Sequence, residues 1–171
     1  MKYPSGKVDH GSLVTIDTAH YEVHEGEFFF AKGFLTMNGA DDETVWMAGL
    51  TDATHSIHMR ASFYAVVETE ITLWEDAAVT DGSALPIYNA KRTSDQEASI
   101  TTVTAPTVVT TEATAIWIGK TNTGKTNSGF SPAMGHEIIL KPSMWYAFQV
   151  TKRNAADNYL DYEIYFYEET H

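Results

Sequence analysis

Residues 119–126 carry the most specific chemical motif in the chain. They read GKTNTGKT, which matches the phosphate-binding Walker A pattern letter for letter, and the apolar run AIWI leads into them. In a nucleotide-binding protein this loop opens a long helix whose first backbone amides hold the phosphates. Gly129, Pro132 and Gly135 follow too closely to allow such a helix. We therefore interpret the motif as an exposed loop between two strands and predict no bound nucleotide.

The segment HYEVHEGE offers a second candidate, a metal site. If this segment is a β-strand, His20, Glu22 and His24 share one face, as in a two-histidine, one-carboxylate site. Positions i and i+4 of a straight strand are about 13 Å apart, however, which is too far for two imidazoles to share one ion. The chain also lacks cysteine and the His-x-His pair that metal-binding cupins use. The sequence therefore predicts no metal ion and no other cofactor.

Side chains for nucleophilic or acid–base catalysis are present, but their spacing selects no active site. The chain has no Gly-x-Ser-x-Gly motif. Its 23 Asp and Glu residues offer many carboxylate pairs of the glycosidase type, and sequence spacing singles out none of them. We predict that the protein has no catalytic residues and is not an enzyme; a small β-sandwich enzyme is the alternative.

Aromatic residues are the remaining candidates for a binding surface. The chain has four Trp and nine Tyr residues, and most of them fall on predicted strands, where packing in the core is their simplest use. In ETEITLWE, Ile71 and Leu73 lie on one face of the predicted strand and Trp74 lies on the other. We identify Trp74 as a candidate residue for a subunit interface or for a glycan-binding surface.

The alternation of apolar and polar residues predicts strands along most of the chain. The clearest alternation spans residues 56–65, 68–75, 145–153 and 159–169. No stretch of a dozen residues predicts an amphipathic helix, and HYEVHEG predicts strand, turn and strand. Composition rich in β-branched and aromatic residues adds further strands, at residues 13–16, 27–34, 44–50, 85–90, 99–103, 107–111, 115–119 and 136–141.

Ten or more short strands in a chain of 171 residues predict an all-β fold. We expect an antiparallel β-sandwich, with a jelly roll as the favoured form. Residues 13–171 would form this single domain. Residues 1–12 are polar and contain Pro and Gly, so we expect an N-terminal arm that becomes ordered only against a partner.

The charge balance argues against nucleic acid and membrane partners. The chain has 23 acidic and 11 basic residues, for a formal net charge of −12, and such a surface repels phosphate backbones. The best local basic pair is Lys91 and Arg92. No apolar run approaches the roughly 20 residues that span a bilayer, and the N-terminus has no signal-peptide pattern. We expect a soluble protein or part of a soluble assembly.

An ordered series of segments spans residues 19–168. It comprises HYEVHEG, LWE, LPIYNAKR, a glycine-rich loop, EIILKP, WYAFQVT and EIYFYE. The series resembles the small β-sandwich virion proteins of tailed bacteriophages, encoded near the capsid genes and described as head-fibre, cement or capsid-decoration proteins.

This resemblance implies a structural role in a virion. It implies homotrimers on the outer capsid surface, with the major capsid protein as partner, and it supplies no catalytic residues. Surface glycans are a further candidate partner, and a receptor- or glycan-binding β-sandwich module is the alternative function.

Overall fold

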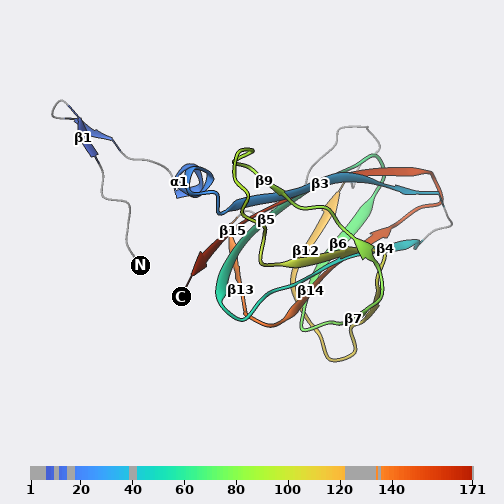
Figure 1. Ribbon diagram of the computed structural model, residues 1–171. Coiled ribbons are helices and arrows are strands. Elements are labelled where there is room, and N and C mark those ends of the chain that lie inside the picture. The colour runs from blue at the N-terminus through green and yellow to red at the C-terminus, as the bar shows by residue number, and fades with distance from the viewer. Residues whose placement is uncertain are drawn as a thin grey trace.

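The computed structural model describes residues 7–9, 12–14, 18–38, 42–121, 134 and 136–170. Eight strands build the body of the protein (Figure 1). They are β3 (Phe28–Met37), β4 (Thr44–Leu50), β5 (His55–Ala65), β6 (Thr69–Glu75), β12 (Thr114–Thr121), β13 (Ile138–Leu140), β14 (Trp145–Lys152) and β15 (Asn158–Thr170).

Smaller elements surround this body. They are β1 (Lys7–Asp9), β2 (Ser12–Val14), α1 (Thr18–Glu25), β7 (Ala78–Thr80), β8 (Ser83–Ala84), β9 (Tyr88–Asn89), β10 (Thr101–Thr104) and β11 (Thr107–Val109).

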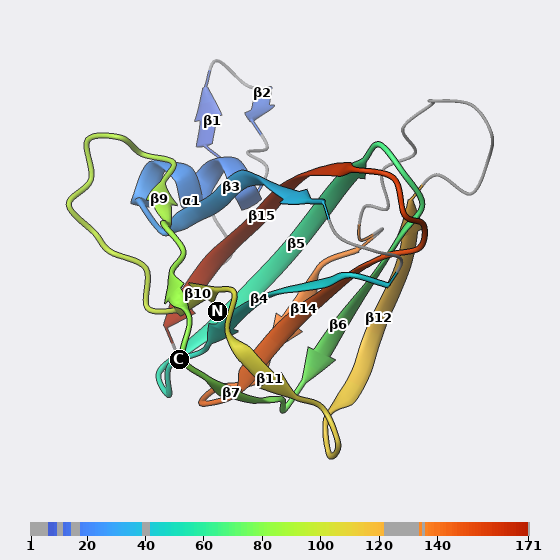
Figure 2. The ribbon, with the colours of Figure 1, turned by 90° about the vertical axis from the view of Figure 1, so that its right-hand side faces the viewer.

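Apart from two small sheets, β1-β2 and β11-β7, the strands form two antiparallel sheets that face each other (Figure 2). A five-stranded sheet has the order β13-β5-β15-β3-β9, and a six-stranded sheet has the order β12-β6-β14-β4-β10-β8. The chain changes sheet at each step from β3 to β6. Later β14 inserts between β4 and β6, and β15 between β3 and β5. This is the eight-stranded jelly-roll arrangement, and it confirms the prediction of an antiparallel β-sandwich.

The core lies between the two sheets because side chains alternate along every strand. β5 buries the odd-numbered residues from Ile57 to Ala65, and β15 buries Leu160, Tyr162, Ile164 and Phe166. At the centre, Phe63 stacks on Trp117, with ring centroids 6.3 Å apart, and meets the ring of Phe148 edge-on at 5.1 Å. The period of two that predicted these strands is thus also the pattern that fills the core.

The insertion of residues 76–113, between β6 and β12, extends both sheets. Its strands β8 and β10 continue the six-stranded sheet beyond β4, and β9 pairs with β3 in the five-stranded sheet. The predicted strand at residues 85–90 is shorter than expected, since only Tyr88–Asn89 pair. Pro86 has no N–H to give to a ladder, and Leu85 instead donates its N–H to the carbonyl of Thr102 at 3.0 Å.

Helix α1 corrects the prediction of strand, turn and strand at HYEVHEG. Residues 20–25 of this segment are helical, and the residue that precedes α1 lies outside the described residues. Gly26 ends the helix with φ at +87°, a conformation that glycine adopts most readily, as the sequence indicated. The N–H groups of Gly26 and Glu27 both donate to the carbonyl of Glu22 at 3.0 Å. The helix was missed because its eight mostly polar residues carry no clear helical periodicity.

β1 and β2 pair with each other across the predicted boundary between the arm and the sandwich domain. Figure 1 shows this pair apart from the sandwich, beyond α1. The arm's ordering against a partner stays a prediction.

Asn158 is fully buried at the start of β15, beside the turn that connects the two sheets. Its Oδ1 accepts hydrogen bonds from the N–H groups of Val66 and Val67, each at 3.2 Å, and its Nδ2 donates to Thr69 Oγ1 at 2.9 Å. The hydroxyl of Thr121 accepts from the N–H of Thr69 and donates to the carbonyl of Val67, both at 3.1 Å. This network joins β15, β6 and β12.

We expect Asn158→Ala to lower the free energy of unfolding by about 2–4 kcal/mol, because it removes the hydrogen bonds that a fully buried amide forms with the N–H groups of Val66 and Val67 and with the Thr69 hydroxyl. Urea denaturation followed by tryptophan fluorescence would measure the loss. Asn154→Ala is the matched control: Asn154 accepts one hydrogen bond from the N–H of Ala156 in an exposed turn, so we expect less than about 1 kcal/mol. Equal losses for the two variants would contradict a special role for Asn158.

Candidate functional site

The outer face of the five-stranded sheet carries the most unusual side chains of the structure. The face alternates with the buried face, so its residues should be mostly polar. Four rows of outward-facing residues instead cross β3, β15 and β5, and three of the four rows contain aromatic side chains. In that strand order, the rows are Phe34–Asp161–Tyr64, Lys32–Glu163–Ser62, Phe30–Tyr165–Arg60 and Phe28–Tyr167–His58.

One end of this face is covered, and acidic groups gather there around His58. The imidazole stacks on the ring of Tyr167, with centroids 4.5 Å apart. Its Nδ1 lies 2.6 Å from Glu137 Oε1, and its Nε2 lies 3.8 Å from Glu169 Oε2. The hydroxyl of Tyr167 donates to the same oxygen of Glu137 at 2.9 Å. Burial, with Glu137 next in effect, raises the pKa of Tyr167, so the phenol stays protonated and serves as a donor.

Glu22 of α1 adds a second acidic pair at this covered end. Its side chain is buried and is hydrogen-bonded to the carboxyl of Glu27. Burial, reinforced by the hydrogen bond and charge of Glu27 and by the charges of Glu169 and Glu25, raises the pKa of Glu22 to about 7. Two carboxyl groups can share a hydrogen bond only when one is protonated, so this pair holds a proton near neutral pH.

The proton on Glu22 makes the stability depend on pH. Its pKa is 4.5 in the unfolded reference and about 7 in the fold, so the native state binds more protons between these values. Stability contributed by Glu22 is therefore complete below pH 4.5 and falls as the pH rises towards 7. Glu22→Gln keeps the neutral form at every pH. We expect the variant to match the wild type below pH 4.5 and to exceed its free energy of unfolding by about 1–3 kcal/mol at pH 8.

Urea unfolding across this pH range would test the expectation. Glu112→Gln is the control, because Glu112 is exposed on the insertion and is not among the groups that act on Glu22. It should leave the pH dependence as in the wild type. A difference between Glu22→Gln and the wild type that is constant with pH would contradict the shared proton.

The other end of the face is exposed and largely aromatic. Phe34 is 70% exposed, Tyr159 55%, Val66 46% and Tyr64 44%, although all are large apolar side chains. Asp161 lies between Phe34 and Tyr64 in the same row and is exposed. An exposed apolar cluster of this kind is a candidate interaction surface.

The sequence prediction missed this surface. The alternation in β15 predicts a half-buried strand, and packing in the core is the simplest use of aromatic residues on such a strand. A signal was available, because the outward positions of YLDYEIYFY carry Tyr159, Tyr165 and Tyr167 in place of the polar residues that an exposed strand face favours.

Trp74 lies on the outer face of the other, six-stranded sheet, as predicted from Ile71 and Leu73. Trp46, Trp74 and Trp145 are half-buried there around Ala48 and Ala147, and Val79 and Val108 of the insertion pack against the same cluster. The indole N–H of Trp74 donates to Gln149 Oε1 at 2.9 Å. Its role in an interface or with glycans stays a prediction.

The described residues of the Walker A motif belong to a strand. Gly119 and Lys120 pair with Ile71 and Glu70, and β12 continues to Thr121, two residues beyond the predicted strand end. Lys120 Nζ lies 3.0 Å from Glu70 Oε2. Residues 122–126 lie outside the described residues, so the interpretation of this stretch as a loop stays a prediction.

The Lys91–Arg92 pair has local partners. Lys91 Nζ donates to the carbonyl of His24 at 2.7 Å, at the C-terminal end of α1, where a positive charge is favourable. Arg92 lies over the ring of Tyr88, 5.8 Å from its centroid. Both basic residues therefore have a structural use.

One histidine does lie beside an aspartate and a hydroxyl, which the sequence reasoning did not anticipate. His55 Nδ1 lies 2.6 Å from Asp52 Oδ2 and 3.1 Å from Thr54 Oγ1. Burial alone would raise the pKa of Asp52, but hydrogen bonds from Thr54 and His55 outweigh it and lower the pKa to about 2. A nucleophile–base–acid relay needs opposite nitrogens of the ring. Here both contacts fall on Nδ1, so this group stabilises the turn before β5.

Metal binding and membrane insertion find no support in the part of the chain that the structure describes. No group of three or more His, Asp or Glu residues there is arranged to hold an ion. His20 and His24 lie on α1, so the strand geometry used against a metal site was wrong. No helix among these residues is long and apolar enough to cross a membrane.

The fold and its surfaces define an all-β jelly-roll protein with an aromatic outer face. No protein-family model matches the chain, and no curated protein matches it in sequence. The resemblance to phage virion proteins therefore rests on the ordered sequence segments alone.

Proposed function

We propose that this chain is a non-catalytic structural protein that decorates the outer surface of a phage capsid and stabilises it. The observation that carries the proposal is the exposed apolar end of the five-stranded sheet, around Phe34 and Tyr159. These large apolar side chains lie exposed on the outer face of the sheet instead of in the core. Burial of these side chains under a partner would be favourable, because it removes apolar surface from water.

Two further features support a role in assembly. The polar clusters of the described residues are accounted for by contacts within the fold, as in the groups around His58 and Asp52, which favours binding over catalysis. The ordered segments also resemble decoration proteins, and the jelly roll is a frequent fold of viral proteins. Fold alone does not fix function, so the assignment to a capsid depends on the resemblance.

Binding to capsids tests the proposal directly. Purified protein is mixed with expanded empty capsids of the virus whose genome encodes it, and bound copies are located by electron cryo-microscopy. We expect density at discrete symmetry sites and a higher disruption temperature of the decorated capsids, because many weak contacts act together.

Phe34→Ser is the interface variant and should reduce occupancy with little change in stability, since Phe34 is 70% exposed. Val109→Ser, at another exposed apolar residue on the insertion, is the matched control and should bind as the wild type does. Absence of binding would count against the proposal. So would a genome in which no capsid or portal gene lies near the gene of this chain.

A receptor- or glycan-binding module is the second candidate. The clustering of Trp46, Trp74 and Trp145 on one sheet face favours it, because half-exposed indole rings can stack on sugar rings. A glycan array would decide. Binding that is lost in Trp74→Ala would support this function, and a blank array would count against it.

A further inference from the structure

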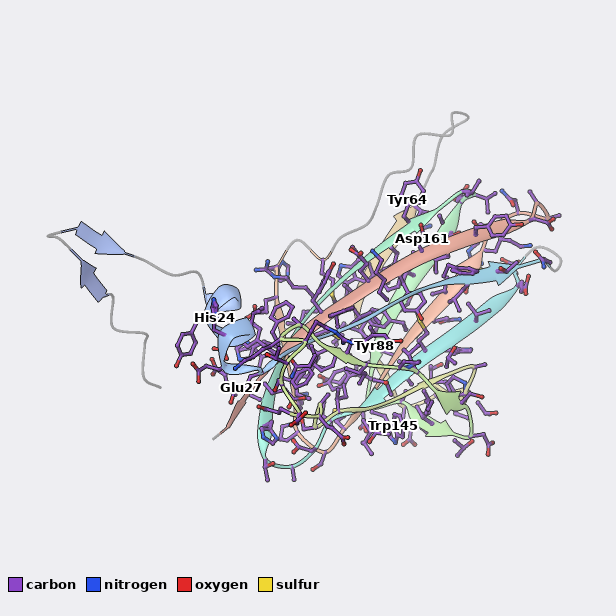
Figure 3. The ribbon with its side chains drawn as sticks, turned by 45° about the horizontal axis from the view of Figure 1, so that its top comes forward. His24, Glu27, Tyr64, Tyr88, Trp145 and Asp161 are labelled. Atoms are coloured by element: carbon purple, nitrogen blue, oxygen red, sulfur yellow. The ribbon has the colours of Figure 1, made fainter. Side chains whose placement is uncertain are left out.

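We infer that the exposed end of the five-stranded sheet is a binding site for the guanidinium group of an arginine side chain from a partner protein. β3, β15 and β5 lie side by side and place Phe34, Asp161 and Tyr64 in one row. Tyr159 precedes Asp161 by two residues and faces the same way. The site is therefore one carboxylate surrounded by three exposed aromatic side chains. Figure 3 shows Tyr64 and Asp161 on the same side of the sandwich.

The surface is hollowed at this place. A depression of about 440 Å³ has Phe34 and Tyr64 in its wall, together with the carboxylates of Asp161 and Glu163. Neighbouring strands are about 4.8 Å apart, so a cation that contacts Asp161 lies within the roughly 6 Å over which an aromatic ring attracts a positive charge. Both rings of the row can act on the same ion.

The charges around the depression favour a cation. Glu163 forms an ion pair with Lys32 and also accepts a hydrogen bond from the hydroxyl of Tyr165 at 2.8 Å. No ion pair to Asp161 occurs among the described residues. The pKa of Lys32 is raised mainly by the hydrogen bond and charge of Glu163, and the charge of Asp161 adds a smaller effect. Two carboxylates and one ammonium leave the site with one net negative charge, in a chain of net charge −12.

Guanidinium fits this chemistry better than ammonium does. Its flat, weakly hydrated face stacks on aromatic rings, while its edge can donate two parallel hydrogen bonds to one carboxylate. A lysine side chain would satisfy Asp161 but would gain less from Phe34 and Tyr64. A neutral sugar could stack on the rings, but it would leave the charge of Asp161 unmatched.

Arg60 is the arginine of the chain that lies on this same face, and it is exposed. A second copy could in principle supply it to Asp161. It sits two rows away from Asp161, however, beside Tyr165, so the isolated chain presents an open carboxylate. The assignment is to a foreign partner, and self-association is one outcome that the experiment distinguishes.

The test is an NMR titration of the ¹⁵N-labelled full chain with acetyl-Gly-Arg-Gly-amide. The matched ligand carries citrulline, which has nearly the shape of arginine without its charge. We expect the arginine peptide to shift the amide signals of Phe34, Tyr64 and Asp161, and the citrulline peptide to bind at least about tenfold more weakly. Asp161→Asn should weaken the arginine peptide by a similar factor, and Asp95→Asn, at an exposed aspartate on the insertion, should leave it unchanged.

Three results would overturn the inference. The first is equal binding of the two peptides. The second is a shift of the same amides by a neutral disaccharide such as cellobiose, with none from arginine. The third is a dimer in sedimentation that Arg60→Gln dissociates, which would assign the site to a second copy. The titration needs no capsid, so its failure and a failure of capsid binding are separate results.

Discussion

The position of β15 is the constraint on which the rest of the structure depends. This strand of 13 residues is the middle strand of the five-stranded sheet and pairs with β3 and β5 along most of its length. The buried amide of Asn158 fixes where it starts, because it is bonded at once to the turn after β5 and to β6. A shift by one residue would exchange the two faces of the strand, moving Phe166 outward and Asp161 into the core. The energetic cost of that exchange makes the observed register unique.

With this register, the outer face of the sheet has two parts that differ in their exposure to solvent. At the end near α1, helix and strand together exclude water, and carboxyl groups remain there only by sharing a proton or contacting His58. At the far end none of the described elements covers the sheet, and aromatic rings and a carboxylate are exposed. The covered end anchors the N-terminal helix to the sandwich, while the open end leaves large side chains such as Phe34 and Tyr64 exposed.

Much of the fold could be predicted from the sequence, because side chains along a strand of a sandwich alternate between the core and the solvent. The sequence therefore alternates between apolar and polar residues. The prediction of β4 at residues 44–50 agrees with the structure at both ends. The helix at HYEVHEG was not predictable in the same way, since its short polar sequence is stabilised by contacts from distant residues. Lys91 and Asn89 both donate to carbonyls at its C-terminal end. Local propensity contains no information about such partners.

The candidate site was harder still, because it consists of ordinary residues on three strands. Phe34, Tyr64 and Asp161 lie far apart in the chain, and only the register brings them into one row. A motif search finds groups that are close in sequence, such as GKTNTGKT, whose described residues instead complete a strand. Trp74 was placed on its correct face because one strand was enough to decide it.

The edge strands of the two sheets are short or irregular, and this limits aggregation at high local concentration. β8, β9 and β13, which end three of the four rims, are only two or three residues long. The fourth, β12, is broken by a bulge between Ala115 and Trp117. A long, flat edge strand presents unpaired N–H and C=O groups with which a strand of another molecule can pair, and this leads to fibres. Short or bulged edge strands disfavour such pairing. Edge-to-edge pairing of strands between neighbouring copies is therefore disfavoured, even where many copies lie close together.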